Sequence, residues 1–283
     1  MRIVSLLPST TEILFGIGAG ADVVGVTFEC DYPAQARTRR VVSTSTMPPG
    51  LAPAQIDEFV RAAMARGEDL YRLDADALSA LDPDLVVTQD LCAVCAVDVA
   101  VVDDALAYLG CRAEVLTVDP HTLAEVFDSI ELLGKATGRE QVASEVAALL
   151  RARVDEVRRR VAGRRRPRVM LLEWTDPPFA PGHWVPEMVE AAGGEPVLAA
   201  AGANSVRTTW EAIRAAQPEA YVVAPCGFGR EAAQQLADEL VANGSVPAGA
   251  RVLAVDADAS WVRPGLRLAD GVEELAYFLH PDA

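Results

Sequence analysis

The chain alternates between short apolar runs rich in β-branched residues and segments whose apolar residues have helical spacing. The first run spans residues 2–7 and ends at Pro8, and Ser9 or Thr10 can then cap a helix over 9–18. Further apolar runs lie at 22–27, 85–88 and 113–118. Strands that alternate with helices pair in parallel, because each helix returns the chain to the same edge of the sheet. The pattern predicts an α/β fold with mostly parallel sheets.

A long helical region from 122 to 161 separates this first series from a second one. A Thr-Gly-Arg sequence at 137–139 marks a break near its middle. The second series opens with a buried strand at 168–174 and closes with a helix at 266–279. The sequence therefore predicts an N-terminal α/β lobe at 1–118, a linker helix at 119–166 and a C-terminal α/β lobe at 167–283.

The two series of strands and helices form an internal repeat. Each opens with a basic residue and a buried strand, and each later contains a short helix, a proline and another strand. The copies read LSALDPDLVV at 78–87 and IRAAQPEAYVV at 213–223. This repeat predicts two similar lobes joined by the long helix. Because ligands of open α/β sheets bind at the C-terminal ends of the strands, we expect loops of both lobes to share one cleft.

Net charge and hydropathy limit the kinds of molecule that the protein can bind. The 283 residues carry a net charge of −16, which argues against nucleic acid, since a phosphate backbone rewards Lys and Arg. No apolar run approaches the roughly 20 residues of a membrane-spanning helix. The charge suits a protein that meets a basic surface. We expect a small-molecule ligand, no nucleic acid and a monomer.

The start of the chain and the number of cysteines indicate the cellular compartment of the protein. The first strand begins at residue 2 and leaves no room for a signal peptide, so the sequence as written predicts a cytoplasmic protein. A true start further upstream would make it extracytoplasmic. Five cysteines, an odd number, argue against a disulfide framework.

Several motifs in a fixed order resemble the class III periplasmic binding proteins of ABC transporters, which bind vitamin B12, haem and siderophores. They are RIVSLLPSTTE at 2–12, GVT at 25–27 followed by DYP at 31–33, PDLVV at 83–87, DPPF at 176–179 and VEAAGG at 189–194. They span essentially the whole chain and are more similar to the cobalamin binders than to the siderophore binders. The resemblance implies two lobes bridged by a rigid helix, as in helical-backbone metal receptors, with modest closure on a ligand.

The same resemblance implies site residues and partners. Tyr32 and Phe179 occupy positions that match cleft aromatics of the cobalamin binders, and Trp261 lies near another. Carboxylates on each lobe dock onto arginines of the permease, and alignment around the proline motifs gives Asp76 and Glu211. The implied function is binding of a corrinoid for ABC-type import, with haem or an iron chelate as further ligands. No cofactor is required.

An aromatic loop at 174–184 is the densest such cluster in the chain. It contains Trp174, Asp176, His183 and Trp184 within a Pro- and Gly-rich stretch. Aromatic faces supply large contact areas, and the loop setting favours a binding surface over a core. The alternative is that the tryptophans are core residues and that His183 caps or hydrogen-bonds.

Two further loops follow predicted strands. Gln89 comes after the strand at 85–88, and Gly227 and Phe228 come after the strand at 221–224. A glycine lets a ligand approach the backbone closely, although a tight turn explains it equally well. The predicted ligand-binding residues are Tyr32, Gln89, Trp174, Asp176, Phe179, His183, Trp184, Gly227, Phe228 and Trp261.

Cys92 and Cys95 form a C-x-x-C motif, which can bind a metal or act as a redox pair. Structural zinc needs four ligands, so Cys30, His183 and Cys226 are the candidates to complete a set. Buried, inert thiols are the alternative.

No nucleophile elbow, P-loop or H-E-x-x-H motif is present in the sequence, and we expect no enzyme. Two alternatives to import remain open. One is a cytoplasmic corrinoid or haem carrier or sensor without a transporter. The other is a Cys/His metal-binding or thiol-redox protein on the same fold.

Overall fold

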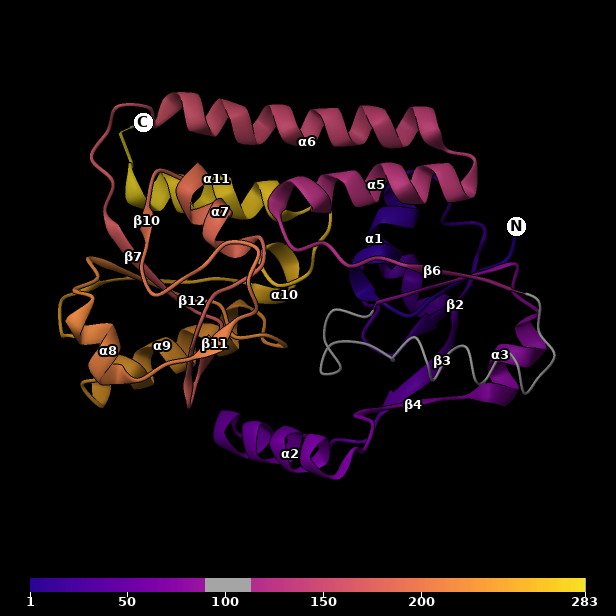
Figure 1. Ribbon diagram of the computed structural model, residues 1–283, viewed down its shortest axis with the longest axis horizontal. Coiled ribbons are helices and arrows are strands. Elements are labelled where there is room, and N and C mark those ends of the chain that lie inside the picture. The colour runs from indigo at the N-terminus through magenta and orange to yellow at the C-terminus, as the bar shows by residue number, and fades with distance from the viewer. Residues whose placement is uncertain (90–112, 283) are drawn as a thin grey trace. The chain divides into compact units, whose positions relative to one another are not determined.

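The structure is a computed structural model that describes residues 1–89 and 113–282. Contacts divide the chain into two compact units. Unit 1 comprises Met1–Asp119 and Asp128–Ala147, and unit 2 comprises Pro120–Phe127 and Ala148–Ala283. Each unit contains its own mostly parallel sheet with flanking helices, which confirms the predicted α/β class (Figure 1).

Unit 1 is built on a six-stranded sheet in the order β4-β3-β2-β1-β5-β6. The strands are β1 (Ile3–Ser5), β2 (Val23–Thr27), β3 (Arg40–Ser45), β4 (Tyr71–Leu73), β5 (Leu85–Thr88) and β6 (Glu114–Thr117). All neighbours pair in parallel except β3 and β4, which are antiparallel. The predicted strands at 2–7, 22–27, 85–88 and 113–118 are confirmed, whereas β3 and β4 were not predicted.

The helices of unit 1 follow the sequence signals closely. They are α1 (Pro8–Gly16), α2 (Pro53–Arg66) and α3 (Ala75–Leu81), with a short 3-10 helix at Ala34–Thr38. Pro8 is the first residue of α1, where its missing N–H costs no hydrogen bond. One core cluster of the unit contains Val4, Leu78 and Val86, which join β1, α3 and β5.

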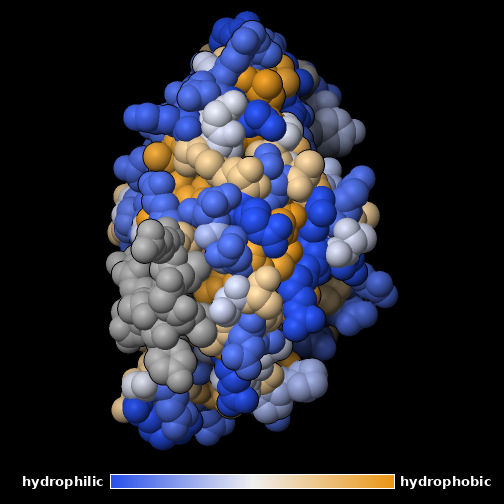
Figure 2. All heavy atoms as spheres, turned by 90° about the vertical axis from the view of Figure 1, so that its right-hand side faces the viewer, coloured by the Kyte–Doolittle hydropathy of each residue, from blue (hydrophilic) through white to orange (hydrophobic). Residues whose placement is uncertain are grey.

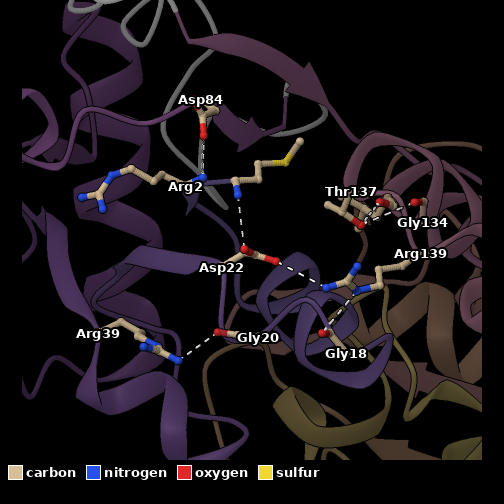
Figure 3. Close-up of polar contacts among 11 residues, drawn as sticks. Arg2, Gly18, Gly20, Asp22, Arg39, Asp84, Gly134, Thr137 and Arg139 are labelled. Atoms are coloured by element: carbon tan, nitrogen blue, oxygen red, sulfur yellow. Dashed lines mark hydrogen bonds and ion pairs between the residues drawn. The ribbon is translucent and has the colours of Figure 1, made fainter.

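Polar contacts secure the C-terminal end of α1 in unit 1 (Figure 3). The carboxylate of Asp22 lies 3.4 Å from the N-terminal ammonium of Met1 and 3.7 Å from the guanidinium of Arg139. Arg139 also donates to the carbonyl of Gly18 at 3.5 Å. Exposed pairs of this kind contribute little to stability individually.

The predicted break in the long helical region is confirmed. The region forms α5 (Leu123–Thr137) and α6 (Glu140–Arg160), and each helix contributes residues to both units. Gly138 adopts a left-handed conformation with φ 65°, which suits glycine at a helix end. A Cβ atom on Gly134 would lie 2.3 Å from the Cβ of Ala143, so the tight hairpin requires glycine there.

Unit 2 contains a four-stranded parallel sheet and a small antiparallel sheet. The first has the order β10-β7-β12-β13, formed by β10 (Glu195–Pro196), β7 (Arg168–Leu172), β12 (Ala220–Val223) and β13 (Arg251–Ala254). The second has the order β11-β9-β8, formed by β11 (Val206–Arg207), β9 (Pro178–Ala180) and β8 (Trp174–Thr175). The helices are α7 (Val185–Ala191), α8 (Trp210–Ala215), α9 (Arg230–Ala242), α10 (Ala257–Ser260) and α11 (Leu268–Leu279).

The sequence repeat corresponds to a repeated set of contacts. In unit 1, Arg2 donates its backbone N–H to the carboxylate of Asp84 at 2.7 Å (Figure 3). Its side chain donates to the carbonyl of Leu81. In unit 2, Arg168 makes the corresponding bonds to Glu219, at 2.9 Å, and to Ala216. Each clamp holds the start of the first strand of its unit against the turn that follows the short helix.

The surface is mixed. Figure 2 shows one face of the molecule, on which hydrophilic side chains predominate and apolar side chains form small groups between them. In the part of the chain that the structure describes, no helix combines the length and the apolar character needed to cross a membrane.

Candidate functional site

Unit 1 has a topological switch point at β1. The chain passes from β1 to β2 on one side, and later to β5 on the other. Ligands of open parallel sheets bind in the crevice outside the strand ends at such a point. Gln89 follows β5 and is buried, whereas Tyr32 follows β2 and is 49% exposed. The structure therefore places both residues at the C-terminal edge of the sheet of unit 1.

A network of small polar side chains lies where β1 passes into α1. The hydroxyls of Ser5 and Thr10 are 2.7 Å apart, and Thr11 donates to Ser5 at 2.8 Å. Thr11 also lies 3.0 Å from the sulfur of Cys30, in the loop after β2. All four residues are buried. The network fixes that loop against α1, and the Ser-Thr-Thr run after the first strand was its only signal in the sequence.

Unit 2 has its switch point between β7 and β12. Trp174 follows β7, Phe228 follows β12, and their ring centroids are 5.7 Å apart in an edge-to-face arrangement. Gly227 has φ 84° and donates its N–H to Asp258 at 3.0 Å. The structure thus brings Trp174, Gly227 and Phe228, three predicted site residues, to one edge of the sheet.

The small antiparallel sheet extends this aromatic edge. Trp174 on β8 is the register partner of Phe179 on β9, and both rings are partly exposed. The indole N–H of Trp174 donates to the carbonyl of Asp176 at 3.1 Å, and the side chain of Asp176 is exposed in the turn. Ser205 donates a short hydrogen bond to Glu173, which joins the segment before β11 to the end of β7.

Two predicted ligand-binding residues are corrected by the structure. Trp184 and Trp261 are 5% and 0% exposed, so neither presents a ring face on which a ligand could stack. The indole N–H of Trp184 donates to the carbonyl of Trp261 at 2.8 Å. Gly271 of α11 packs against Trp261. Both rings belong to the core of unit 2, which for Trp184 is the alternative that the sequence left open.

His183 lies beside the aromatic sheet of unit 2 and is partly buried. Its ring centroid is 5.9 Å from that of His121 and 5.7 Å from that of Trp184. Burial lowers the pKa of His183, and the neighbouring His121 lowers it further. The ring therefore favours the neutral form, which has a free lone pair.

The predicted cysteine and histidine metal set stays a prediction. Cys92 and Cys95 fall outside the described residues. Cys30 is buried in the network of unit 1, and Cys226 is exposed in unit 2, where its N–H donates to Glu173. Within the described ranges, no three His, Cys, Asp or Glu side chains are placed to share one ion.

Asp76 and Glu211 occupy equivalent places in the repeat. Each is the second residue of a short helix, after an N-cap residue, Asp74 or Thr209, whose side chain accepts a backbone N–H. Both carboxylates are exposed. Among the described residues neither takes part in a hydrogen bond or ion pair. A carboxylate in the first turn also favours the helix itself, so position alone does not assign a docking role.

A surface hollow of about 620 Å³ lies in unit 2 between α6 and α11. Leu149, Arg153 and Tyr277 are among its lining residues. None of the predicted ligand-binding residues lines it, so the hollow is distinct from the aromatic edge.

Comparison with known proteins places these features in a family. A family model described as periplasmic binding protein matches residues 3–252. An uncharacterized ABC transporter substrate-binding lipoprotein of Bacillus subtilis is 27% identical over 99% of this chain and 80% of its own length. The vitamin B12-binding protein of Vibrio cholerae is 22% identical over 98% of this chain and 88% of its own.

Solved structures show the same fold. The periplasmic vitamin B12 binding protein BtuF of Vibrio cholerae matches with a TM-score of 0.68 and 22% identity, covering 99% of this chain and 96% of that one. The periplasmic heme-binding protein RhuT of Roseiflexus sp. RS-1 matches with a TM-score of 0.70 and 22% identity, covering 99% and 98%. With the family match over most of its length, the chain belongs to the periplasmic binding proteins.

Proposed function

We propose that this solute-binding protein takes a corrinoid as its ligand and delivers it to an ABC importer. The observation that carries the ligand class is the pair of Trp174 and Phe228 at the switch point of unit 2. Their partly exposed rings offer apolar faces to a large ring system. Relatives named as vitamin B12-binding proteins support a corrinoid, and heme-binding structures of the same fold make haem or an iron chelate the alternative ligand.

Polar groups at the same edges suit the rim of a corrinoid, which carries amide side chains. The exposed carboxylate of Asp176 can accept hydrogen bonds from amide N–H groups. The amide of Gln89 in unit 1 stays a predicted contact, since its side chain is buried. The proposed function is reversible binding, with no bond made or broken in the ligand.

A calorimetric titration of the purified, reduced protein with cyanocobalamin tests the ligand, with haem as comparator. The expected result is one-to-one corrinoid binding in the micromolar range or tighter. Tight binding of haem without binding of cyanocobalamin would assign haem, instead of a corrinoid, as the ligand. Failure of both ligands to bind would contradict the proposal.

Docking to a permease is tested at Asp76 and Glu211. The double variant Asp76→Arg, Glu211→Arg should abolish ligand-stimulated ATP hydrolysis by the reconstituted importer while leaving ligand affinity unchanged. The matched control is Glu231→Arg, because Glu231 is likewise an exposed second residue of a helix, α9. Loss of ligand affinity in the double variant would contradict the docking role. Corrinoid binding without any effect on an importer would favour a carrier or sensor that has no transporter.

A further inference from the structure

Two of the three histidines of the chain lie together in unit 2, although they are far apart in the sequence. The ring centroids of His121 and His183 are 5.9 Å apart, with an angle of 40° between the ring planes. Both side chains are partly buried. The third histidine, His280, lies elsewhere in the unit, with its Nε2 3.2 Å from the carbonyl of Gly193.

The backbone of His121 is fixed by the start of α5. Thr122 and Glu125 form a capping box: Glu125 donates its N–H to the hydroxyl of Thr122 at 3.2 Å and accepts the N–H of Thr122 at 3.1 Å. The same carboxylate accepts the N–H of His121 at 2.6 Å. Glu187 of α7 accepts the N–H of Leu123 at 2.5 Å, which ties α7 to the start of α5. His183 lies just before α7, so this bond helps to hold the two histidines together.

His183 is held in a conformation that costs energy. Its φ is 51°, in the left-handed region that residues other than glycine rarely adopt. Two backbone bonds maintain it: the N–H of His183 donates to Ala203 at 2.6 Å, and its carbonyl accepts the N–H of Gly202 at 3.0 Å. The loop thus determines where the imidazole ring lies, and it does so against the local preference of the chain.

The two nitrogens of the His183 ring differ. The side chain of Asn204 is the polar side chain that lies close enough to the ring to act on it. Nε2 is buried and has no hydrogen-bond partner among the described residues. A buried polar atom without a partner is costly and calls for a group that is absent from the protein chain, such as water or an ion. Histidines that bind metals commonly have one nitrogen oriented by a polar neighbour and the other directed to the metal.

We propose that His121 and His183 together bind a divalent transition-metal ion of the kind that prefers imidazole, such as Ni²⁺ or Zn²⁺. With metal–nitrogen distances of about 2.0–2.1 Å, two imidazoles on one tetrahedral or wider-angled ion have ring centroids roughly 5–6.5 Å apart. The observed 5.9 Å falls in this range. Since no third protein ligand joins them within the described ranges, water completes the coordination. The site does not depend on the proposed corrinoid.

The simplest alternative is that the rings only pack against each other and against Trp184, with water at Nε2. If the rings only pack in this way, replacing either histidine should not change the affinity of the protein for a metal ion.

A titration with Ni²⁺ in reducing, chelator-free buffer tests the proposal on the intact chain. We expect binding in the micromolar range, weakened at least about tenfold by either His121→Phe or His183→Asn. Phe retains a ring beside His183, and Asn tolerates a left-handed backbone. The matched control is His280→Gln, which should leave the affinity within about twofold. Absence of Ni²⁺ binding, or equal loss in the control, would overturn the site.

Two measurements on the unaltered protein keep the test independent of whether the variants fold. Paramagnetic Ni²⁺ should broaden the ring proton signals of His121 and His183 in NMR spectra before those of His280. With Co²⁺, the absorption spectrum should lack thiolate charge-transfer bands. Strong thiolate bands, or broadening of all three histidines together, would assign the metal to other groups and overturn the proposal.

Discussion

Units 1 and 2 share a framework, which consists of a first parallel strand, a short helix and the turn that joins this helix to the next strand. They differ at the edge where their parallel strands end. In each, an arginine at the start of the first strand bonds to a carboxylate and to a carbonyl of the turn after a short helix. Arg2 bonds to Asp84 and Leu81, and Arg168 bonds to Glu219 and Ala216. The residue before the proline of each turn is left-handed, with φ 41° at Asp82 and 47° at Gln217. The repeat therefore extends to individual hydrogen bonds.

The C-terminal edges carry different chemistry. In unit 1 the first strand passes directly into α1, and the edge is lined by hydroxyls and the thiol of Cys30. In unit 2 the corresponding strand passes into the small sheet β8–β9–β11, and the edge carries Trp174, Phe179 and Phe228. The shared framework stabilises each unit. The segments that follow the strands of a unit determine what the C-terminal edge of its sheet can bind.

The largest effect is expected in the shared core. Leu6 and Leu172 lie four residues after the equivalent arginines, and both are buried in core clusters. Leu6→Ala and Leu172→Ala should each lower the free energy of unfolding by about 2–5 kcal/mol, because each leaves a cavity. Urea unfolding measures the change. A cost below about 1 kcal/mol at only one position would show that the two frameworks are not equivalent.

A smaller effect concerns the edges. Trp174→Leu should weaken corrinoid binding about tenfold through loss of aromatic contact area, whereas Gln89→Ala should weaken it only a few-fold through loss of one polar contact. Titration calorimetry measures both. The matched control is Trp210→Leu on α8, since Trp210 packs against the core of unit 2. Equal losses at Trp174 and Trp210 would attribute the effect to stability instead of ligand contact.

The clamp of unit 2 should make the stability of the fold depend on pH. The hydrogen bond from Arg165, followed by that from the backbone of Arg168, lowers the pKa of Glu219 below 4.5. Its charged form therefore stabilises the fold above about pH 4.5, and this contribution is lost as the pH falls through the lowered pKa. Glu219→Gln should cost less than about 1 kcal/mol near neutral pH, and less still in acid. Unfolding midpoints measured across the acid range check this, and a cost that grows in acid would contradict it.

The smallest effect is expected at the left-handed positions. Gln217→Gly should raise the free energy of unfolding by a few tenths to about 1 kcal/mol, because glycine adopts positive φ without strain. Asp82→Gly should gain less, since aspartate tolerates this conformation better than glutamine. Thermal unfolding resolves the order. A loss of stability at Gln217 would indicate that its side chain makes a compensating contact.

Local patterns account for the part of the fold that was predicted. The strand β1, the helix α1 and the break between α5 and α6 each follow from apolar periodicity and from Pro or Gly at their ends. The strands β8 and β11 have two residues each, too few to show a period, and they exist because β9 lies between them. The shared cleft and the domain bounds at 118 and 166 stay predictions.

The sequence by itself determined the α/β class, the repeat and the family, because these depend on the order of short motifs along the chain. Only the tertiary structure decided which aromatic residues are exposed. Trp174 and Trp184 belong to one aromatic stretch of the sequence, yet only Trp184 is buried, and its indole N–H donates to the carbonyl of Trp261 within the core. Likewise, only folding brings His121 next to His183. The exposure of a side chain and its distance from another side chain depend on elements from distant parts of the sequence that pack together. A local sequence pattern does not determine them.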